Sequence, residues 1–265
     1  MKVALATVIE SSNDNLGPGA AWKEWDDTNP DCEPLEEEAI RCFTAWRKRG
    51  GWLADADIYC VCPSHRLPSS ETVRELEGLG VTYIEKFFSE TDGFDCGYMN
   101  VPLACAWLED QVDADFLVHV DLDMVLMQPL PQHLFNVSVT VGALCDEEMK
   151  PWQLVEVDNN FESCFIIASR ESGFFGRWWY EARTLPRFWS IPEKISAETE
   201  EYAIDAMLAK GMSIHPLFHY QVGFRYNPAN IPDENIPGVL FHHNHMYESK
   251  DNFDEFMRRK LRWRS

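Results

Sequence analysis

The chain has 265 residues, of which 45% are hydrophobic and 13% aromatic, so it can bury the core of one large α/β domain and is not mainly disordered. Its formal net charge of −21 at pH 7 argues against nucleic acid and anionic membranes as partners. The same charge repels an anionic substrate, which therefore needs a metal ion or a local basic group where it binds.

The first half of the chain alternates predicted strands and helices. The clearest helix, 34–49, begins at Pro34, carries acidic residues in its first turn and basic residues in its last turn, and so complements its own dipole. Apolar runs predict strands, and two further segments have helical patterns. The predicted strands are 2–9, 57–62, 81–84 and 116–120, and the other helices are 70–78 and 97–112. This alternation predicts a mainly parallel sheet.

The second half is more mixed. Its predicted strands are 137–144, 161–168, 212–215 and 239–241, and its predicted helices are 171–183, 197–210 and 251–262. No internal repeat or linker divides the chain, so we expect a single domain over residues 1–265.

The eight cysteines lie mostly in apolar runs, and no two of them form a Cys-x-x-Cys pair. A zinc ribbon or thioredoxin-type site is therefore not indicated, and buried free thiols predict a reducing, cytoplasmic location. Residues 1–10 are typical of a first strand rather than a signal peptide. No apolar run has the length of a transmembrane segment.

The most informative motif is the carboxylate pair Asp121 and Asp123, directly after the apolar run 116–120. Asp-x-Asp also occurs at 55–57 and 113–115, but these two pairs precede apolar runs and are typical of solvated strand starts. Open α/β sheets bind ligands at the carboxyl ends of strands, and carboxylates are the preferred ligands of hard divalent cations. The pair therefore predicts a metal site, with a capped strand end as the alternative.

Three histidines follow the late apolar run 239–241: His242, His243 and His245. Imidazole suits Mn²⁺ and later transition metals better than Ca²⁺, so one of them is a candidate metal ligand. On a regular strand His243 and His245 face one side and His242 the other, so all three cannot bind one ion. A polar turn with one packed histidine is the alternative.

Two other groups could take part in catalysis or binding. Glu200 and Glu201 open the predicted helix 197–210, where a carboxylate can act as a general base or simply as a partner of the helix dipole. The acidic cluster 146–148 is the rival candidate for the base. Asn100, near the start of the helix 97–112, can bind phosphate or ribose hydroxyls.

The order of these motifs resembles that of the nucleotide-sugar glycosyltransferases of the GT-A fold. The similar elements are the first strand at 3–8, the stretch 97–123 from Asn100 through Asp-Leu-Asp, the strand 161–168, Thr199-Glu200-Glu201, and the late run 241–244. The ending His-x-x-Gly-x-x-Lys-Pro-Trp of glycogenin-like enzymes is absent, which leaves the retaining or inverting outcome open.

The resemblance implies an α/β, GT-A-like single domain with a mixed, mainly parallel central sheet flanked by helices. Residues 1–127 then form the nucleotide-sugar-binding half, which ends in the Asp-x-Asp motif. Residues 128–265 form the acceptor half with the C-terminal histidine motif. The implied roles are donor binding for Thr7, Val8, Asn100 and Asp121, binding of Mn²⁺ or Mg²⁺ for Asp121, Asp123 and His242, and catalysis for Glu201 and Glu200.

The function that the resemblance implies is metal-dependent transfer of a sugar from a nucleoside-diphosphate sugar to a glycan or another hydroxyl acceptor. A nucleotidyltransferase that makes a nucleotide sugar is one alternative. It is less favoured because the loop after the first strand contains only Lys23 as a cation. A non-catalytic sugar- or metal-binding domain is the other alternative.

Overall fold

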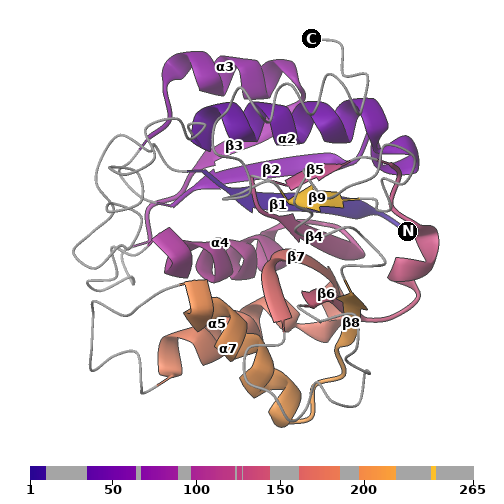
Figure 1. Ribbon diagram of the computed structural model, residues 1–265. Helices are drawn as coiled ribbons and strands as arrows, with labels where there is room; N and C mark the ends of the chain where they lie inside the picture. Colours follow the sequence, from indigo (N-terminus) through magenta and orange to yellow (C-terminus); the bar gives the residue numbers. More distant parts are fainter. Residues whose placement is uncertain are drawn as a thin grey trace, which may run out of the picture.

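The computed structural model describes residues 1–9, 35–63, 67–88, 97–122, 124–126, 128–143, 161–185, 197–218 and 240–242. A central sheet lies between two layers of helices (Figure 1). Helices α2 (Leu35–Arg49) and α3 (Ser70–Gly78) cover one face, and α4 (Gly97–Gln111), α5 (Phe174–Thr184) and α7 (Ala197–Ala209) cover the other. This arrangement confirms the predicted α/β class.

The central sheet has seven strands in the order β3-β2-β1-β4-β7-β6-β8. Only β7 runs against its neighbours, β4 and β6, and the other pairings are parallel. The mixed, mainly parallel sheet is therefore confirmed. The strands are β1 (Val3–Val8), β2 (Asp57–Cys62), β3 (Val81–Glu85), β4 (Phe116–Val120), β6 (Val139–Ala143), β7 (Phe161–Ser169) and β8 (His215–Phe218).

A second, two-stranded sheet joins β5 (Met124–Leu126) to β9 (Leu240–His242) in antiparallel pairing. Three short 3-10 helices in the described part of the chain were not predicted, because segments of three or four residues are too short to show a hydrophobic periodicity. They are η1 (Gly51–Leu53), η3 (Gln132–Phe135) and η5 (Arg170–Ser172).

Helix α3 begins and ends where its sequence predicts, and α2 begins one residue after the predicted start and ends at the predicted residue. Helix α2 has three glutamates in its first turn and three basic residues in its last turn, a distribution that stabilises the helix dipole. Helix α3 is capped by Ser69, whose hydroxyl accepts a hydrogen bond of 3.1 Å from the Thr72 amide. That contact satisfies one of the amides that a helix start leaves unpaired.

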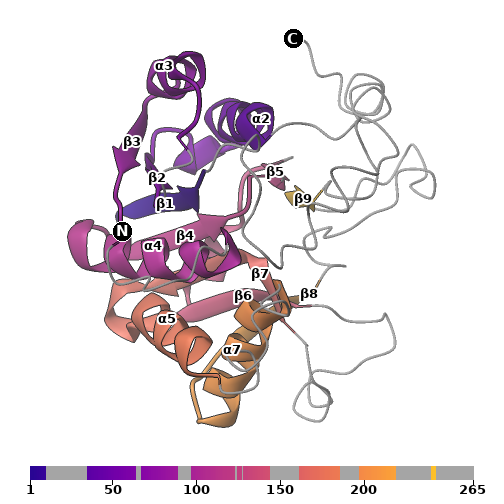
Figure 2. The ribbon, with the colours of Figure 1, turned by 90° about the vertical axis from the view of Figure 1, so that its left-hand side faces the viewer.

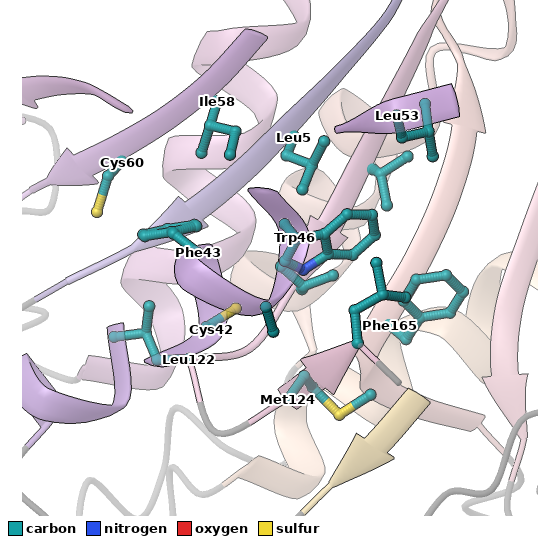
Figure 3. Close-up of a cluster of buried hydrophobic side chains, with 14 of the residues drawn as sticks. Leu5, Cys42, Phe43, Trp46, Leu53, Ile58, Cys60, Leu122, Met124 and Phe165 are labelled. Carbon is teal, nitrogen blue, oxygen red and sulfur yellow. The ribbon is translucent and has the colours of Figure 1, made fainter. Parts of the chain in front are cut away.

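Apolar side chains fill both spaces between the sheet and the helices. On the α2 side, Phe43 and Trp46 pack with Leu5 of β1, Met124 of β5 and Phe165 of β7 (Figure 3). All five are completely buried. Strand β5 is therefore held in the core by its own side chains, and β9 is placed by pairing with it.

The opposite face is packed with aromatic residues. Phe174, Phe175 and Trp178 of α5 are completely buried and pack with Leu108 of α4 and Ile166 of β7. This cluster fixes α5 between α4 and α7 and brings the start of α7 close to the sheet. Trp178 is therefore a residue of the hydrophobic core.

The predicted strand 212–215 is wrong: the strand is β8, His215–Phe218. Strand β8 contains Pro216, which cannot donate a hydrogen bond to a sheet. Since β8 is the last strand of its sheet, one side of its backbone needs no sheet partner, and an edge strand tolerates proline. The predicted helix 251–262 lies outside the described residues.

Five cysteines of the described part are free and buried, as expected: Cys42, Cys60, Cys62, Cys105 and Cys164. None of the helices within the described ranges is long and apolar enough to cross a membrane. The division of the chain at residue 127 stays a prediction.

Candidate functional site

Asp121 directly follows β4, and β4 ends at the carboxyl edge of the parallel strands (Figure 2). Strand β1 pairs with β4 on one side, and the antiparallel β7 pairs with it on the other. The Asp121 amide donates a hydrogen bond of 2.9 Å to the Cys164 carbonyl, so β7 holds the backbone just beyond the end of β4. The side chain is 37% exposed, so the carboxylate can reach a ligand from solvent.

The other Asp-x-Asp pairs lie at the opposite edge, where the strands begin. Asp57 and Asp113 each lie within 4 Å of the Lys2 ammonium, at 3.7 and 3.8 Å. Asp115 accepts a hydrogen bond of 2.6 Å from the Lys2 amide. All three are exposed. This confirms the prediction that only the pair starting at Asp121 follows a strand.

His119 lies beneath Asp121 on the α4 side of the sheet, because residues two apart on a strand share a face. Its ring is 1% exposed. Nε2 lies 3.1 Å from Oδ1 of Asp121, and Nδ1 lies 3.2 Å from the Ala6 carbonyl and 3.5 Å from the Cys105 sulfur. Every polar atom of the ring therefore has a partner.

The pKa of His119 reflects a balance of opposing effects. Burial alone would lower the pKa, but the Cys105 sulfur and the carboxylate of Asp121 together raise it well above the usual value. The chain of Cys105, His119 and Asp121 has the order of residues of a nucleophilic triad. It cannot act as one, because Cys105 is completely buried and no substrate can reach its sulfur.

Glu200 is a buried carboxyl group at the start of α7, with only 4% of the residue exposed. Oε2 accepts a hydrogen bond of 2.8 Å from the Ser163 hydroxyl, and the backbone carbonyl accepts one of 3.0 Å from the Trp178 indole. Oε1 has no hydrogen-bond partner within the described residues. Burial, and then the charge of Asp121, raise the pKa of Glu200 well above its usual value.

These contacts bring two of the sequence-predicted regions together. The helix start with Glu200 and the strand end with Asp121 are close enough for their charges to interact. Glu201, the other candidate base, follows on α7 and is 9% exposed. The rival acidic cluster 146–148 lies outside the described residues.

The candidate donor-binding residues lie around the same edge. The Thr7 hydroxyl is buried and donates a hydrogen bond of 2.7 Å to the Val120 carbonyl, so it ties the end of β1 to the end of β4. Val8 is the half-buried last residue of β1, and Asn100 is buried in the first turn of α4.

The candidate metal ligands other than Asp121 are only partly placed. Asp123 lies outside the described residues, as do His243 and His245. His242 is the last residue of β9, and its backbone lies opposite Met124, the residue after Asp123. The β5–β9 pair thus brings the backbone of His242, the first residue of the late histidine run, beside the residue that follows the Asp-x-Asp motif. Within the described residues no group of three or more potential metal ligands occurs.

Sequence reasoning missed three residues of the site: His119, Cys105 and Ser163. His119 carried a visible signal, since it is a polar residue in an apolar strand, two positions before Asp121. The other two residues have no local signal, because each reaches the site through packing between elements distant in sequence.

The likeness to known proteins lies in the fold. No protein-family model and no curated protein matches the sequence. Two crystal structures of the glycosyltransferase GlyE from Streptococcus pneumoniae TIGR4, one of them the apo form, match over 91% of this chain, with TM-scores of 0.53 and 0.52 and identities of 15% and 12%. The match spans 54% of the GlyE chain. This chain therefore shares the fold of a glycosyltransferase.

Proposed function

We propose that the protein is a metal-dependent glycosyltransferase of the GT-A type, which moves a sugar from a nucleoside-diphosphate sugar to a hydroxyl acceptor. The observation that carries the proposal is the partly exposed Asp121 carboxylate at the end of β4, next to the buried Glu200 at the start of α7. The shared fold with GlyE supports it. The match covers only 54% of the GlyE chain, so GlyE does not show what this protein binds. The donor and acceptor are therefore proposed from the site of this chain itself.

The residues present fit a hard divalent cation. Asp121 offers a carboxylate that is partly open to solvent, and the β5–β9 pairing brings the backbone of His242 next to the residue that follows Asp123. We propose that Asp121, Asp123 and His242 hold Mn²⁺ or Mg²⁺. When bound, such a cation neutralises the negative charge that develops on the leaving nucleoside diphosphate. It also offsets the repulsion from a protein of net charge −21.

For the donor, we propose that Asn100 and the backbone of Thr7 and Val8 contact the nucleoside. The Thr7 side chain is already engaged by Val120, so its contribution is to fix the end of β1. Asp121 is also a candidate acceptor of a hydrogen bond from the ribose.

For catalysis, we propose Glu200 or Glu201 as the general base that accepts the proton of the acceptor hydroxyl. A raised pKa makes the ionised Glu200 a stronger base than an ordinary carboxylate. The Ser163 hydroxyl donates to one of its oxygens, and the other oxygen is buried without a hydrogen-bond partner within the described residues. Replacing each glutamate by glutamine, one at a time, tests which one acts, because glutamine keeps the shape and cannot accept the proton.

The experiment that tests the proposal is thermal melting with UDP, GDP, ADP and CDP, each with and without Mn²⁺. A ligand that binds only the folded state raises the melting temperature. We expect one nucleotide to raise it only when Mn²⁺ is present, and Asp121→Asn to remove the shift.

The matched control is Asp113→Asn, which changes the first residue of another Asp-x-Asp pair at the opposite edge, where the side chain is 96% exposed. We expect this variant to keep the full shift. A Mn²⁺-independent shift that persists in Asp121→Asn would contradict the proposal. Binding without sugar transfer or donor hydrolysis indicates the binding domain, and release of pyrophosphate from a nucleoside triphosphate indicates the nucleotidyltransferase.

A further inference from the structure

The buried imidazole of His119 connects the sheet backbone to the carboxylate of Asp121. Ala6 and His119 are directly paired residues of β1 and β4, and Nδ1 lies 3.2 Å from the Ala6 carbonyl oxygen. The ring of Trp178 lies 6.0 Å away between centroids. The ring is therefore held by the backbone of one strand, by its own strand and by an aromatic neighbour.

The hydrogen-bond partners determine which ring nitrogen carries a proton. Nε2 lies 3.1 Å from Oδ1 of Asp121, and a bare nitrogen at that distance would place its lone pair against the carboxylate. Nε2 therefore carries a proton and donates it. Nδ1 either donates to the Ala6 carbonyl or accepts from the Cys105 thiol, whose sulfur lies 3.5 Å away. In both arrangements Nε2 is the donor to Asp121.

We propose that His119 is a positioning residue, which fixes the rotation of the Asp121 carboxylate so that its second oxygen is presented to a divalent cation. The inference rests on the proposed metal site. Oδ1 is held by His119, and Oδ2 of Asp121 has no hydrogen bond within the described residues. A carboxylate with one oxygen fixed loses less rotational freedom when the other oxygen binds a metal.

The placement of this contact supports a role in binding rather than in stability alone. A buried imidazole in a strand costs more than an apolar side chain would, since its polar atoms must leave water. The neighbours of His119 on β4, Val118 and Val120, are apolar and completely buried. Only the residue that reaches Asp121 is polar, which is typical of a partner that orients a metal ligand.

Two amide substitutions separate positioning from packing. In His119→Gln the amide nitrogen can reach the place of Nε2 and donate to Asp121. In His119→Asn it can reach only the place of Nδ1, near the Ala6 carbonyl. Both variants are uncharged and remove the same ring from the Trp178 cluster, so we expect similar losses of thermal stability.

Binding of Mn²⁺ alone, measured by electron paramagnetic resonance of the free ion, is the readout. We expect His119→Asn to weaken Mn²⁺ binding by about 10–100-fold, the range for loss of a partner of a metal ligand, and His119→Gln to retain most of the affinity. Equal affinities in the two variants, whether both unchanged or both weakened, would overturn the inference.

A third variant, Asp121→Asn, tests the metal site without changing His119. If it binds Mn²⁺ as the wild type does, the metal site itself is wrong and the inference falls with it. If it loses Mn²⁺ while the two His119 variants remain equal, only the positioning role is wrong.

A measurement on the wild-type protein covers the case in which a His119 variant does not fold. Long-range ¹H–¹⁵N correlation spectra report which ring nitrogen of a histidine is protonated. We expect a protonated Nε2 for His119. A bare Nε2 would overturn the inference, because the ring could not donate to Asp121.

Discussion

At the scale of single residues, the site is built from polar groups that are costly to bury. His119 and Glu200 are 1% and 4% exposed, and an ionisable group at such positions destabilises the fold unless it is paired. Each has partners: His119 has Asp121 and Ala6, and Glu200 has Ser163. Two buried ionisable groups that meet at one strand end are typical of a functional site rather than of a purely structural core.

Two glycines with the same backbone angle provide a test at this scale. Gly51 and Gly173 both have φ of 57°, a left-handed conformation that costs an alanine about 1–2 kcal/mol. A Cβ on Gly51 would lie 2.7 Å from Cγ of Pro129, whereas one on Gly173 meets no described heavy atom within 4 Å. The Pro129 ring is rigid, so Gly51→Ala adds an overpacking cost of about 1–3 kcal/mol.

We therefore expect Gly51→Ala to lower the free energy of unfolding more than Gly173→Ala does, as measured by urea denaturation. Gly173→Ala is the matched control, since it changes the same residue type at the same φ. Equal losses in the two variants would contradict the close approach of Pro129.

The residues of the site differ in how far the sequence reveals them. Asp121 was identified because it follows a strand, and His119 could have been, because alternation along a strand places it on the same face. The pairing of Ser163 with Glu200 joins residues 37 positions apart. No local pattern specifies that contact, since it depends on how α7 packs on β7.

At the scale of elements, the carboxylate of Glu36 links the start of α2 to the start of α3. Oε2 of Glu36, in the first turn of α2, accepts hydrogen bonds from the Ser69 amide at 3.0 Å and from the Thr72 hydroxyl. Burial acts to raise the pKa of Glu36, but the hydrogen bonds from Thr72 and Ser69 outweigh it and lower the pKa below the usual value. The folded state therefore favours the ionised carboxylate.

This link predicts a pH-dependent stability. Because the pKa of Glu36 is lower in the folded state, its contribution is present above the unfolded pKa of about 4.3 and is lost as the pH falls through the folded value. Glu36→Gln should lower the free energy of unfolding at pH 7 by about 1 kcal/mol or less, after allowance for solvent screening. The difference from wild type should shrink as the pH falls through the folded pKa, because the wild-type carboxyl then becomes protonated too.

The measurement is urea denaturation of both proteins between pH 3 and pH 7. Glu77→Gln is the control, since it removes the same charge from an exposed position on α3. Parallel pH profiles for the two variants would show that net charge, rather than the link to Ser69 and Thr72, causes the effect.

Most element types were predictable, because hydrophobic period, capping residues and turn residues act locally. Helix α3 and strands β2 and β4 have the predicted boundaries. Strand β8, which was predicted at 212–215 and lies at His215–Phe218, shows the limit of this reasoning. Whether Pro216 can lie in a strand depends on the strand's place at the edge of the sheet, which is a property of the tertiary fold.

At the scale of the whole molecule, the carboxyl edge gathers segments from most of the chain. Strands β1 and β4, the start of α7 and the β5–β9 pair all meet near this edge (Figure 2). The overall electrostatic potential of a protein with a net charge of −21 repels an anionic donor. The proposed cation therefore provides the local positive charge that the rest of the molecule lacks.

The pairing of β9 with β5 leads to the last prediction, which concerns the third metal ligand. His242 is the described histidine of the late run, and its backbone lies opposite Met124, adjacent to Asp123 in the chain. We expect His242→Ala to weaken Mn²⁺ binding at least about tenfold, as loss of a direct ligand should cost no less than loss of its supporting partner.

His243→Ala is the matched control and should bind Mn²⁺ as the wild type does. Free Mn²⁺ is again measured by electron paramagnetic resonance. The opposite result, with weakened binding only in His243→Ala, would move the ligand by one residue and retain the role of the β5–β9 pair in bringing the histidine run to the carboxyl edge.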